Sequence, residues 1–280
     1  ASDSAEDENI TLWVNWGRDQ ATALNSLIMD FFTPETGINV NLKMVNASLV
    51  NGILSGNFPD VSLHLARTEP VNLGMRDALY DLTQFDDLDE VLTRFQPGAD
   101  IPYRYKDGLY ALPDTQAFFT MFYRRDILDS MQLEVPETWE EFIHAATLIQ
   151  RSNMQIYVPY TQITTATTVN VGIGSLNLFP TLLQQRGLSL YNDGQNATAI
   201  NRPEAIAVFM DWTRMYTDFK YVKEADFYNR FRVGTMPLGI APYSIYMTLS
   251  QAAPEIEGRW SIAPVPGTKG GNHLVAGSGT

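Results

Sequence analysis

The chain contains 280 residues, 45% of them hydrophobic and 11% aromatic, which supports a large buried core and excludes a disordered or fibrous protein. Its 19 Lys and Arg against 32 Asp and Glu give a formal charge of −13, which argues against nucleic acid as a partner because the phosphate backbone would be repelled. The absence of Cys excludes disulfides and thiolate sites, and no apolar run approaches the roughly 18 residues of a membrane-spanning helix.

The first part of the chain alternates predicted strands and helices. After a small, acidic segment at residues 1–9, which we expect to be a disordered tail, hydrophobic residues recur with period two or at helical spacing. Strands are predicted at 10–16, 38–44 and 61–65, and helices at 24–31 and 49–54. This order predicts a parallel sheet with right-handed crossovers. His64 lies between Leu63 and Leu65, and we expect it to pack on one face of the third strand.

The second part of the chain is also predicted to be α/β. A short strand at 110–113 leaves the first sheet, residues 114–117 cross over, and a strand at 118–123 enters a new region. Thr138-Trp-Glu-Glu141 matches a capping box and begins a helix. Its expected buried residues are Phe142, Ala145, Ala146 and Ile149. A further helix at 203–216 is expected to bury Ile206, Phe209, Met210 and Thr213. Strands are predicted at 156–160, 238–241 and 260–265, and a loop at 164–168.

Motifs for metal, nucleotide or covalent chemistry are missing from the sequence. His64, His144 and His273 are widely separated and show no HExxH spacing. There is no GxSxG or GxxxxGK motif, Gly277-Ser278-Gly279 is too short for a nucleophile turn, and Val171-Gly172-Ile173-Gly174 is half of a dinucleotide fingerprint. We therefore expect no metal, no cofactor and no catalytic nucleophile.

Carboxylate pairs leave an enzymatic alternative open. Asp86 with Asp87, or Glu140 with Glu141, could serve as the acid and base of a glycosidase. With 32 acidic residues such pairs also arise by chance, and a solvated surface is the favoured interpretation.

Aromatic residues follow several predicted strands or begin loops. Trp16, Tyr160, Phe179 and Tyr243 are examples, and each could either fill a core or stack on the C–H face of a sugar. Ligands of open α/β sheets sit outside the carboxyl ends of the strands, which favours the second interpretation for the group as a whole.

Several motifs in sequence order resemble a known family. YKDGLYALPDTQAFFTMFYRRDIL and VPETWEEF are followed by RGLSLYND, RPEAIAVFMDW, FRVGTMPLGIAPYS and RWSIAPVPGT. These segments lie at 105–128, 135–142, 186–193, 202–212, 231–244 and 259–268. Together they resemble extracellular solute-binding proteins of the sugar-type family that serves ABC importers.

The resemblance implies a two-lobed, type II periplasmic-binding-protein-like α/β fold. Lobe 1 would comprise residues 10–113 and 275–280, and lobe 2 residues 114–274, with hinge crossings near 111–117 and 273–278. Family members usually continue well beyond the returning strand, so we expect lobe 1 to be incomplete and the sequence to be cut from a longer protein.

The resemblance also implies a function. A sugar or oligosaccharide would be captured in the cleft between the lobes by hinge closure, without catalysis, and passed to an ABC transporter permease. The protein would be a monomer located outside the cytoplasm, periplasmic or anchored to the cell surface as a lipoprotein. The alternatives are a glycoside-active enzyme and the ligand-sensing domain of a signalling system.

The implied ligand-binding residues lie in loops that line the cleft of such proteins. They are Trp16, Gly17, Arg18, Arg67, Asp114, Thr115, Gln116, Pro242, Tyr243 and Ser244, to which the aromatic pattern adds Tyr160. Tyr243 stands where the family more often has Trp and would stack on the sugar, while Arg67 and Gln116 would bind hydroxyls. Alternatively, Tyr243 covers the core of the second lobe and Arg67 pairs with Glu69.

Overall fold

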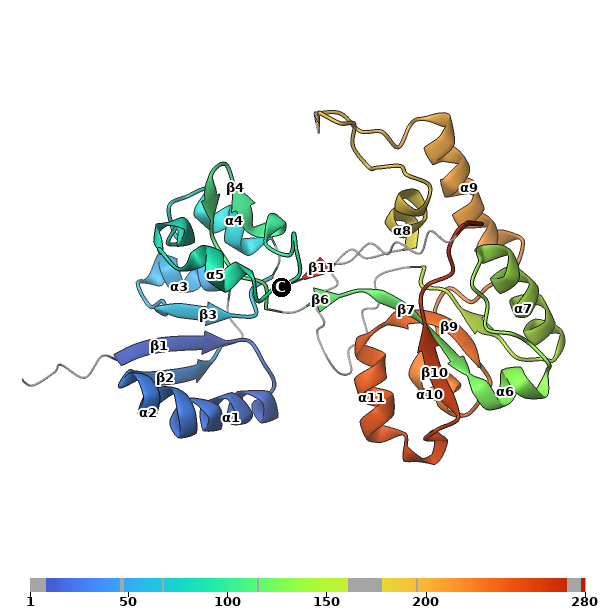
Figure 1. The fold of residues 1–280 in the computed structure, drawn as a ribbon, viewed down its shortest axis with the longest axis horizontal. Coiled ribbons are helices and arrows are strands. Elements are labelled where there is room, and N and C mark those ends of the chain that lie inside the picture. The colour runs from blue at the N-terminus through green and yellow to red at the C-terminus, as the bar shows by residue number, and fades with distance from the viewer. Residues whose placement is uncertain are drawn as a thin grey trace, which may run out of the picture. The chain divides into compact units, whose positions relative to one another are not determined.

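The computed structural model describes residues 9–45, 48–66, 68–114, 116–160, 178–194, 196–270 and 278–279. The chain divides into two compact units, unit 1 (Ala1–Gln116 and Gly279–Thr280) and unit 2 (Ala117–Ser278). Short strands β6 (Gln116–Ala117) and β11 (Ser278–Gly279) pair where the chain passes from one unit to the other (Figure 1). Of the expected tail, Asn9 belongs to the first strand, and residues 1–8 lie outside the described residues.

Unit 1 is built around a parallel sheet of three strands in the order β2-β1-β3. The strands are β1 (Asn9–Val14), β2 (Asn39–Met44) and β3 (Val61–Leu63). Leu12 is paired with Leu42 on one side and with Val61 on the other. The parallel sheet predicted from the alternating pattern is therefore confirmed.

Helices cover both faces of this sheet (Figure 1). They are α1 (Arg18–Leu27), the π-helical turn η1 (Ile28–Phe32), α2 (Thr33–Thr36), α3 (Leu49–Ser55), α4 (Glu69–Gly74) and α5 (Leu88–Leu92). Because side chains alternate along a strand, Leu12 and Val14 pack with α1, whereas Trp13 packs on the other face with α3 and α4. The remaining elements of unit 1 are η2 (Leu82–Gln84), η3 (Ile101–Tyr103), β4 (Arg104–Tyr105) and β5 (Gly108–Leu109).

Three boundaries in unit 1 differ from the predicted ones. The third strand ends at Leu63 because His64 has φ of 60°, so His64 begins the following loop and does not pack on the strand. Residues 110–113 form no strand, and the extended segment lies earlier, at β5. The first helical segment continues beyond the predicted end at 31, through Pro34 in the first turn of α2, and ends at Gly37 with φ of 76°.

Unit 2 contains a mixed sheet in the order β10-β7-β9-β8. Its strands are β7 (Phe119–Arg124), β8 (Ile156–Tyr157), β9 (Leu238–Pro242) and β10 (Trp260–Ala263). The central strand β7 is antiparallel to β9 and β10, whereas β8 runs parallel to β9. The helices are α6 (Arg125–Ser130), α7 (Trp139–Arg151), α8 (Leu178–Gln185), α9 (Pro203–Thr217), α10 (Phe227–Arg232), α11 (Ser244–Ala252) and the turn η4 (Pro254–Ile256).

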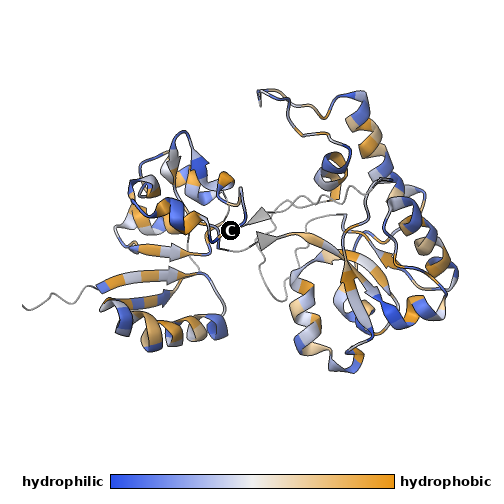
Figure 2. Ribbon diagram, in the orientation of Figure 1, coloured by the Kyte–Doolittle hydropathy of each residue, from blue (hydrophilic) through white to orange (hydrophobic). Residues whose placement is uncertain are grey.

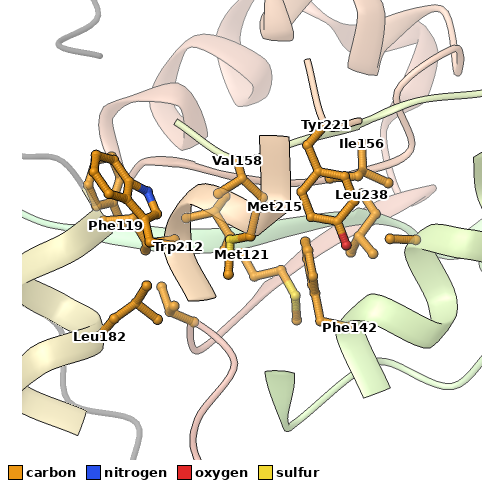
Figure 3. Close-up of a cluster of buried hydrophobic side chains, with 14 of the residues drawn as sticks. Phe119, Met121, Phe142, Ile156, Val158, Leu182, Trp212, Met215, Tyr221 and Leu238 are labelled. Carbon is orange, nitrogen blue, oxygen red and sulfur yellow. The ribbon is translucent and has the colours of Figure 1, made fainter. Parts of the chain in front are cut away.

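The larger core of unit 2 lies between its sheet and helices α7, α8 and α9. Met121 and Leu238 from the sheet meet Phe142 from α7, Leu182 from α8 and Met215 from α9 (Figure 3). A second cluster on the opposite face joins Phe122 to α10 and α11. Hydrophobic residues accordingly gather along the strands of both units (Figure 2). The sheet of unit 2 is covered on both faces.

The predicted capping box is confirmed and positions α7. The Thr138 side chain accepts a hydrogen bond from the Glu141 amide at 3.2 Å, and a Glu141 carboxylate oxygen accepts one from the Thr138 amide at 3.1 Å. All four residues expected on the inner face of this helix are buried. The local sequence signal was sufficient here because both partners of the cap lie within four residues.

The predicted inner face of α9 is wrong. Ile206, Phe209 and Met210 are 47%, 47% and 58% exposed, and Thr213 is half-buried. The buried residues of this helix are Ala205, Val208, Trp212, Met215 and Tyr216. The helix carries two apolar stripes, and the stripe containing Trp212 is buried because its ring stacks on Tyr160 and on Phe179. Periodicity alone could not choose between them.

Two buried tyrosines of unit 2 provide a matched test of this core. The Tyr216 hydroxyl donates to the carbonyls of Val158 and Pro159 at 3.2 and 3.1 Å. The buried Tyr221 hydroxyl has no hydrogen-bond partner within the described ranges. We expect Tyr216→Phe to lower the free energy of unfolding by about 1 kcal/mol, and Tyr221→Phe to leave it unchanged or raise it by up to about 1 kcal/mol. Urea denaturation of both variants would measure this, and a clear loss of stability in Tyr221→Phe would contradict it.

Candidate ligand-binding site

A cavity of about 180 Å³ opens in unit 1 beyond the carboxyl ends of its parallel strands. Asn15 directly follows β1, Val45 follows β2, and residues 64–66 follow β3. Its other lining residues are Trp13, Val14, Ser48, Leu49, Ser62, Leu63 and Glu69. This edge of an open parallel sheet is where α/β proteins bind ligands, because the strand ends and the loops that follow them converge there. Complete small-molecule sites measure roughly 300 Å³ or more, so this cavity is smaller than a complete site.

One residue of the cavity wall, Trp13, is almost completely buried. Trp13 is 6% exposed, and its indole N–H has no hydrogen-bond partner in the described part of the chain. The ring lies close against α3 at Gly52, where an added Cβ would be 2.7 Å from the indole. A buried donor left unpaired costs free energy unless an ordered water pairs with it.

The loop after β3 contributes the His64 imidazole to this region, where it meets the Asp114 carboxylate. His64 Nδ1 lies 3.3 Å from Asp114 Oδ2, and the Trp16 ring centroid is 6.3 Å from that of His64. Glu69, at the start of α4, accepts a hydrogen bond from the Ala66 amide at 3.3 Å. The structure thus brings Trp16 and Asp114, both predicted site residues, together around His64, which was not predicted as one.

The other predicted residues of unit 1 contribute less to this group. Gly17 is the N-cap of α1 and Arg18 its first residue, and both are exposed. Gln116 lies in β6 at the end of unit 1. Arg67 and Thr115 lie outside the described residues, so the predicted hydroxyl contacts of Arg67 and its alternative pairing with Glu69 stay predictions. The loop predicted at 164–168 also lies outside them.

In unit 2 the predicted Tyr243 is part of a stack of rings. Its ring is stacked on Phe118, with 5.0 Å between centroids, and on Tyr246, with 5.5 Å and an interplanar angle of 7°. Pro242 ends β9, Tyr243 is the N-cap of α11, and Ser244 is its first residue. All three rings are half-buried. We call Phe118, Tyr243 and Tyr246 the ring stack.

Tyr160 has a different environment from the ring stack. Its ring is stacked on Trp212 and meets Tyr216 edge-on at 4.9 Å, and the Lys223 ammonium lies 5.2 Å from its centroid. Phe179 likewise packs on Phe209 and Trp212. The structure therefore places both aromatic rings against the core of unit 2.

The sequence held partial signals for the residues that were missed. Tyr246 is three positions after Tyr243, which is the spacing of neighbours on a helix face. Asn15 lies near the carboxyl end of the strand predicted at 10–16. Nothing in the sequence indicated that Phe118 would stack on Tyr243, since Phe118 precedes β7 whereas Tyr243 follows β9, far along the chain.

The described residues form neither a cluster of metal ligands nor a membrane-spanning helix. No group of three or more His, Asp or Glu side chains converges among them to hold a metal ion. None of the helices within those ranges is long and apolar enough to cross a lipid bilayer.

The model of one protein family matches residues 28–279, and its description is "Bacterial extracellular solute-binding protein". The chain belongs to this family. The match spans both units, and the motifs that suggested the resemblance lie within it. The expectation of an extracellular solute-binding protein with an α/β fold is therefore confirmed.

Individual relatives of this solute-binding protein include sugar-binding proteins. A curated "Multiple sugar-binding protein" of Streptococcus mutans is 25% identical over 151 residues, which is 51% of this chain. The match spans about a third (34%) of the length of that relative.

Solved structures share the fold. Maltose-bound T. maritima MalE3 is 21% identical, with a TM-score of 0.69, 97% of this chain covered and 70% of that chain. The GacH receptor of Streptomyces glaucescens, solved unliganded and with acarbose, is 18% identical with a TM-score of 0.72, covering 97% of this chain and 69% of that one. A cyclic α-maltosyl-1,6-maltose binding protein from Arthrobacter globiformis has 18% identity and a TM-score of 0.73, covering the same shares of the two chains.

Proposed function

We propose that this solute-binding protein captures a sugar or oligosaccharide and delivers it to the permease of an ABC importer without transforming it. The observation that carries the proposal is the cavity at the carboxyl ends of β1 and β3, which Trp13 and His64 help to line, with the Asp114 carboxylate beside His64. Donors and acceptors of this kind suit hydroxyl groups, which both donate and accept hydrogen bonds. The sugars named for the similar proteins support the same class of ligand.

The proposal gives each part of the candidate site a role. The unit 1 cavity would hold one sugar ring through hydrogen bonds, and the ring stack of unit 2 would contact the apolar C–H face of a sugar. The protein would be a monomer held outside the cytoplasm by a lipid anchor. Its two lobes would close around the ligand. Scattering with saturating sugar should then show a smaller radius of gyration.

Calorimetry with a panel of maltose, maltotriose, mannobiose and acarbose tests the ligand class. We expect at least one member to bind, with no change in the sugar after prolonged incubation. Hydrolysis of any member at enzyme-like rates would overturn the proposal in favour of a glycoside-active enzyme. Failure of every sugar to bind would overturn the ligand class itself.

The ring stack gives a residue-level prediction. Tyr243→Leu keeps an apolar side chain but removes the stacked ring, so we expect sugar binding to weaken by about 1 kcal/mol, or roughly fivefold in Kd. Tyr191→Leu is the matched control, because Tyr191 is a 57% exposed tyrosine of unit 2 outside the ring stack. Since Tyr243 contacts two other rings, melting temperature is measured alongside affinity. Unchanged affinity in a destabilised Tyr243→Leu would assign the ring to the core.

A further inference from the structure

His64 and Asp114 form a contact that joins two distant parts of unit 1. The two residues are 50 positions apart, and their side chains are 17% and 26% exposed. His64 lines the cavity of unit 1, whereas Asp114 lies two residues before the end of the first part of that unit. The left-handed backbone at His64, with φ of 60°, is uncommon for a residue with a side chain and ends β3 at this point.

We propose that His64 is a positioning residue that holds the Asp114 carboxylate for sugar hydroxyls, so that protonation of His64 strengthens sugar binding. This inference rests on the proposed function and deepens it by adding a dependence on pH. It also gives a role to a residue for which sequence reasoning had assigned only packing.

The chemistry follows from what each group can donate and accept. A carboxylate offers about four acceptor positions, so one bond from the imidazole leaves others for hydroxyl groups. A protonated imidazole attracts the carboxylate and restricts its rotation, and a carboxylate that is already fixed loses less freedom when a ligand binds. Loss of the imidazole proton removes this attraction, leaving Asp114 less well fixed.

Two acidic side chains lie near His64. Asp114, from the segment after β5, is 3.3 Å from His64 Nδ1, and Glu69, from the start of α4, lines the same cavity as His64. Because Glu69 is itself an acid, it cannot replace the attraction between a protonated His64 and the Asp114 carboxylate. Imidazole is the side chain whose ordinary pKa, roughly 6.5, lies nearest to neutrality, which places the expected change in a range where the protein can be studied folded.

The test is the pH profile of sugar affinity in three proteins. The probe is the panel sugar that binds wild type, measured by calorimetry from about pH 5.5 to about pH 8, which spans the ordinary titration of imidazole. We expect Kd for wild type to rise roughly two- to fivefold over this range, the size typical of a partly exposed ion pair. His64→Asn should bind with a flat profile, because Asn tolerates positive φ and supplies an amide donor that does not titrate.

His144→Asn is the matched control, since His144 is an exposed histidine on α7 of unit 2. It should keep the wild-type profile. If His64→Asn fails to fold, His64→Gln serves the same purpose with a longer amide side chain. A sugar that binds with the same pH profile in wild type and in the His64 variant would overturn this inference while leaving the proposed function intact. Absence of binding by every sugar at every pH would overturn both.

Discussion

Replacing Phe142 by Ala should lower the free energy of unfolding of unit 2 by about 3–5 kcal/mol. The Phe142 side chain is completely buried in α7, where it meets Trp139 and Tyr221 edge-on with centroids 5.7 and 6.3 Å apart. Removing it leaves a cavity in the largest core cluster, because the surrounding sheet and helices can only partly collapse into the space. Urea denaturation of the full chain, followed by tryptophan fluorescence, measures the change.

Phe209→Ala is the matched control for this prediction. The Phe209 ring, on α9, is 47% exposed. Its removal should therefore cost roughly 1 kcal/mol of stability, mainly from its edge contacts with Phe179 and Trp212. A control that loses as much stability as Phe142→Ala would show that the outer stripe of α9 is buried after all.

Replacing Arg124 by Met should cost about 3 kcal/mol, because it removes four hydrogen bonds from a nearly buried site. The guanidinium pairs with both oxygens of Asp126 at 2.8 and 2.7 Å. It also donates to the carbonyls of Phe231 and Arg232 at 3.1 and 3.0 Å, which satisfies the end of α10. Arg186→Met is the control, since the pair of Arg186 with Asp211 is exposed and should contribute less than about 1 kcal/mol.

The same interaction predicts a dependence of stability on pH. The hydrogen bond from Arg124 lowers the pKa of the Asp126 carboxyl below its usual value of 3.8, although partial burial opposes the shift. Because the pKa of Asp126 is lower in the folded than in the unfolded protein, the pair stabilises the fold at pH values above the unfolded-state pKa. This contribution is lost as the pH falls through the folded-state pKa. Wild type should therefore lose stability more steeply than Arg124→Met below about pH 4. Parallel losses in the two proteins would contradict this.

Elements whose signals are local could be predicted from the sequence. The capping box at Thr138 determined where α7 begins and which of its residues are buried. Alternation around Leu12 identified β1 and its parallel partner strands. In both cases the decisive contacts lie within a few residues or follow from a regular period.

The features that escaped prediction depend on contacts between distant residues. The buried stripe of α9 is chosen by Tyr160 and Phe179, and the ring stack joins Phe118 to Tyr243. The end of β3 depends on the positive φ of His64. A sequence suggests a positive φ where it has glycine, and histidine at this position gave no such indication. Of the candidate site, the sequence pointed to Trp16, Asp114 and Tyr243, but not to the partners that surround them.

The strand order of the two sheets has a consequence for how the chain folds. The three described strands of the unit 1 sheet are all available once residue 63 has been made, because they follow one another along the sequence. In unit 2 the central strand β7 must wait for β9 and β10, and the hydrogen bond from Thr120 to Ala263 spans 143 residues. Contacts this distant in sequence slow folding, because a long loop must close before they form. During synthesis unit 1 can therefore acquire its sheet early, whereas unit 2 exposes Met121 and Phe122 until nearly the whole of its sequence has been made.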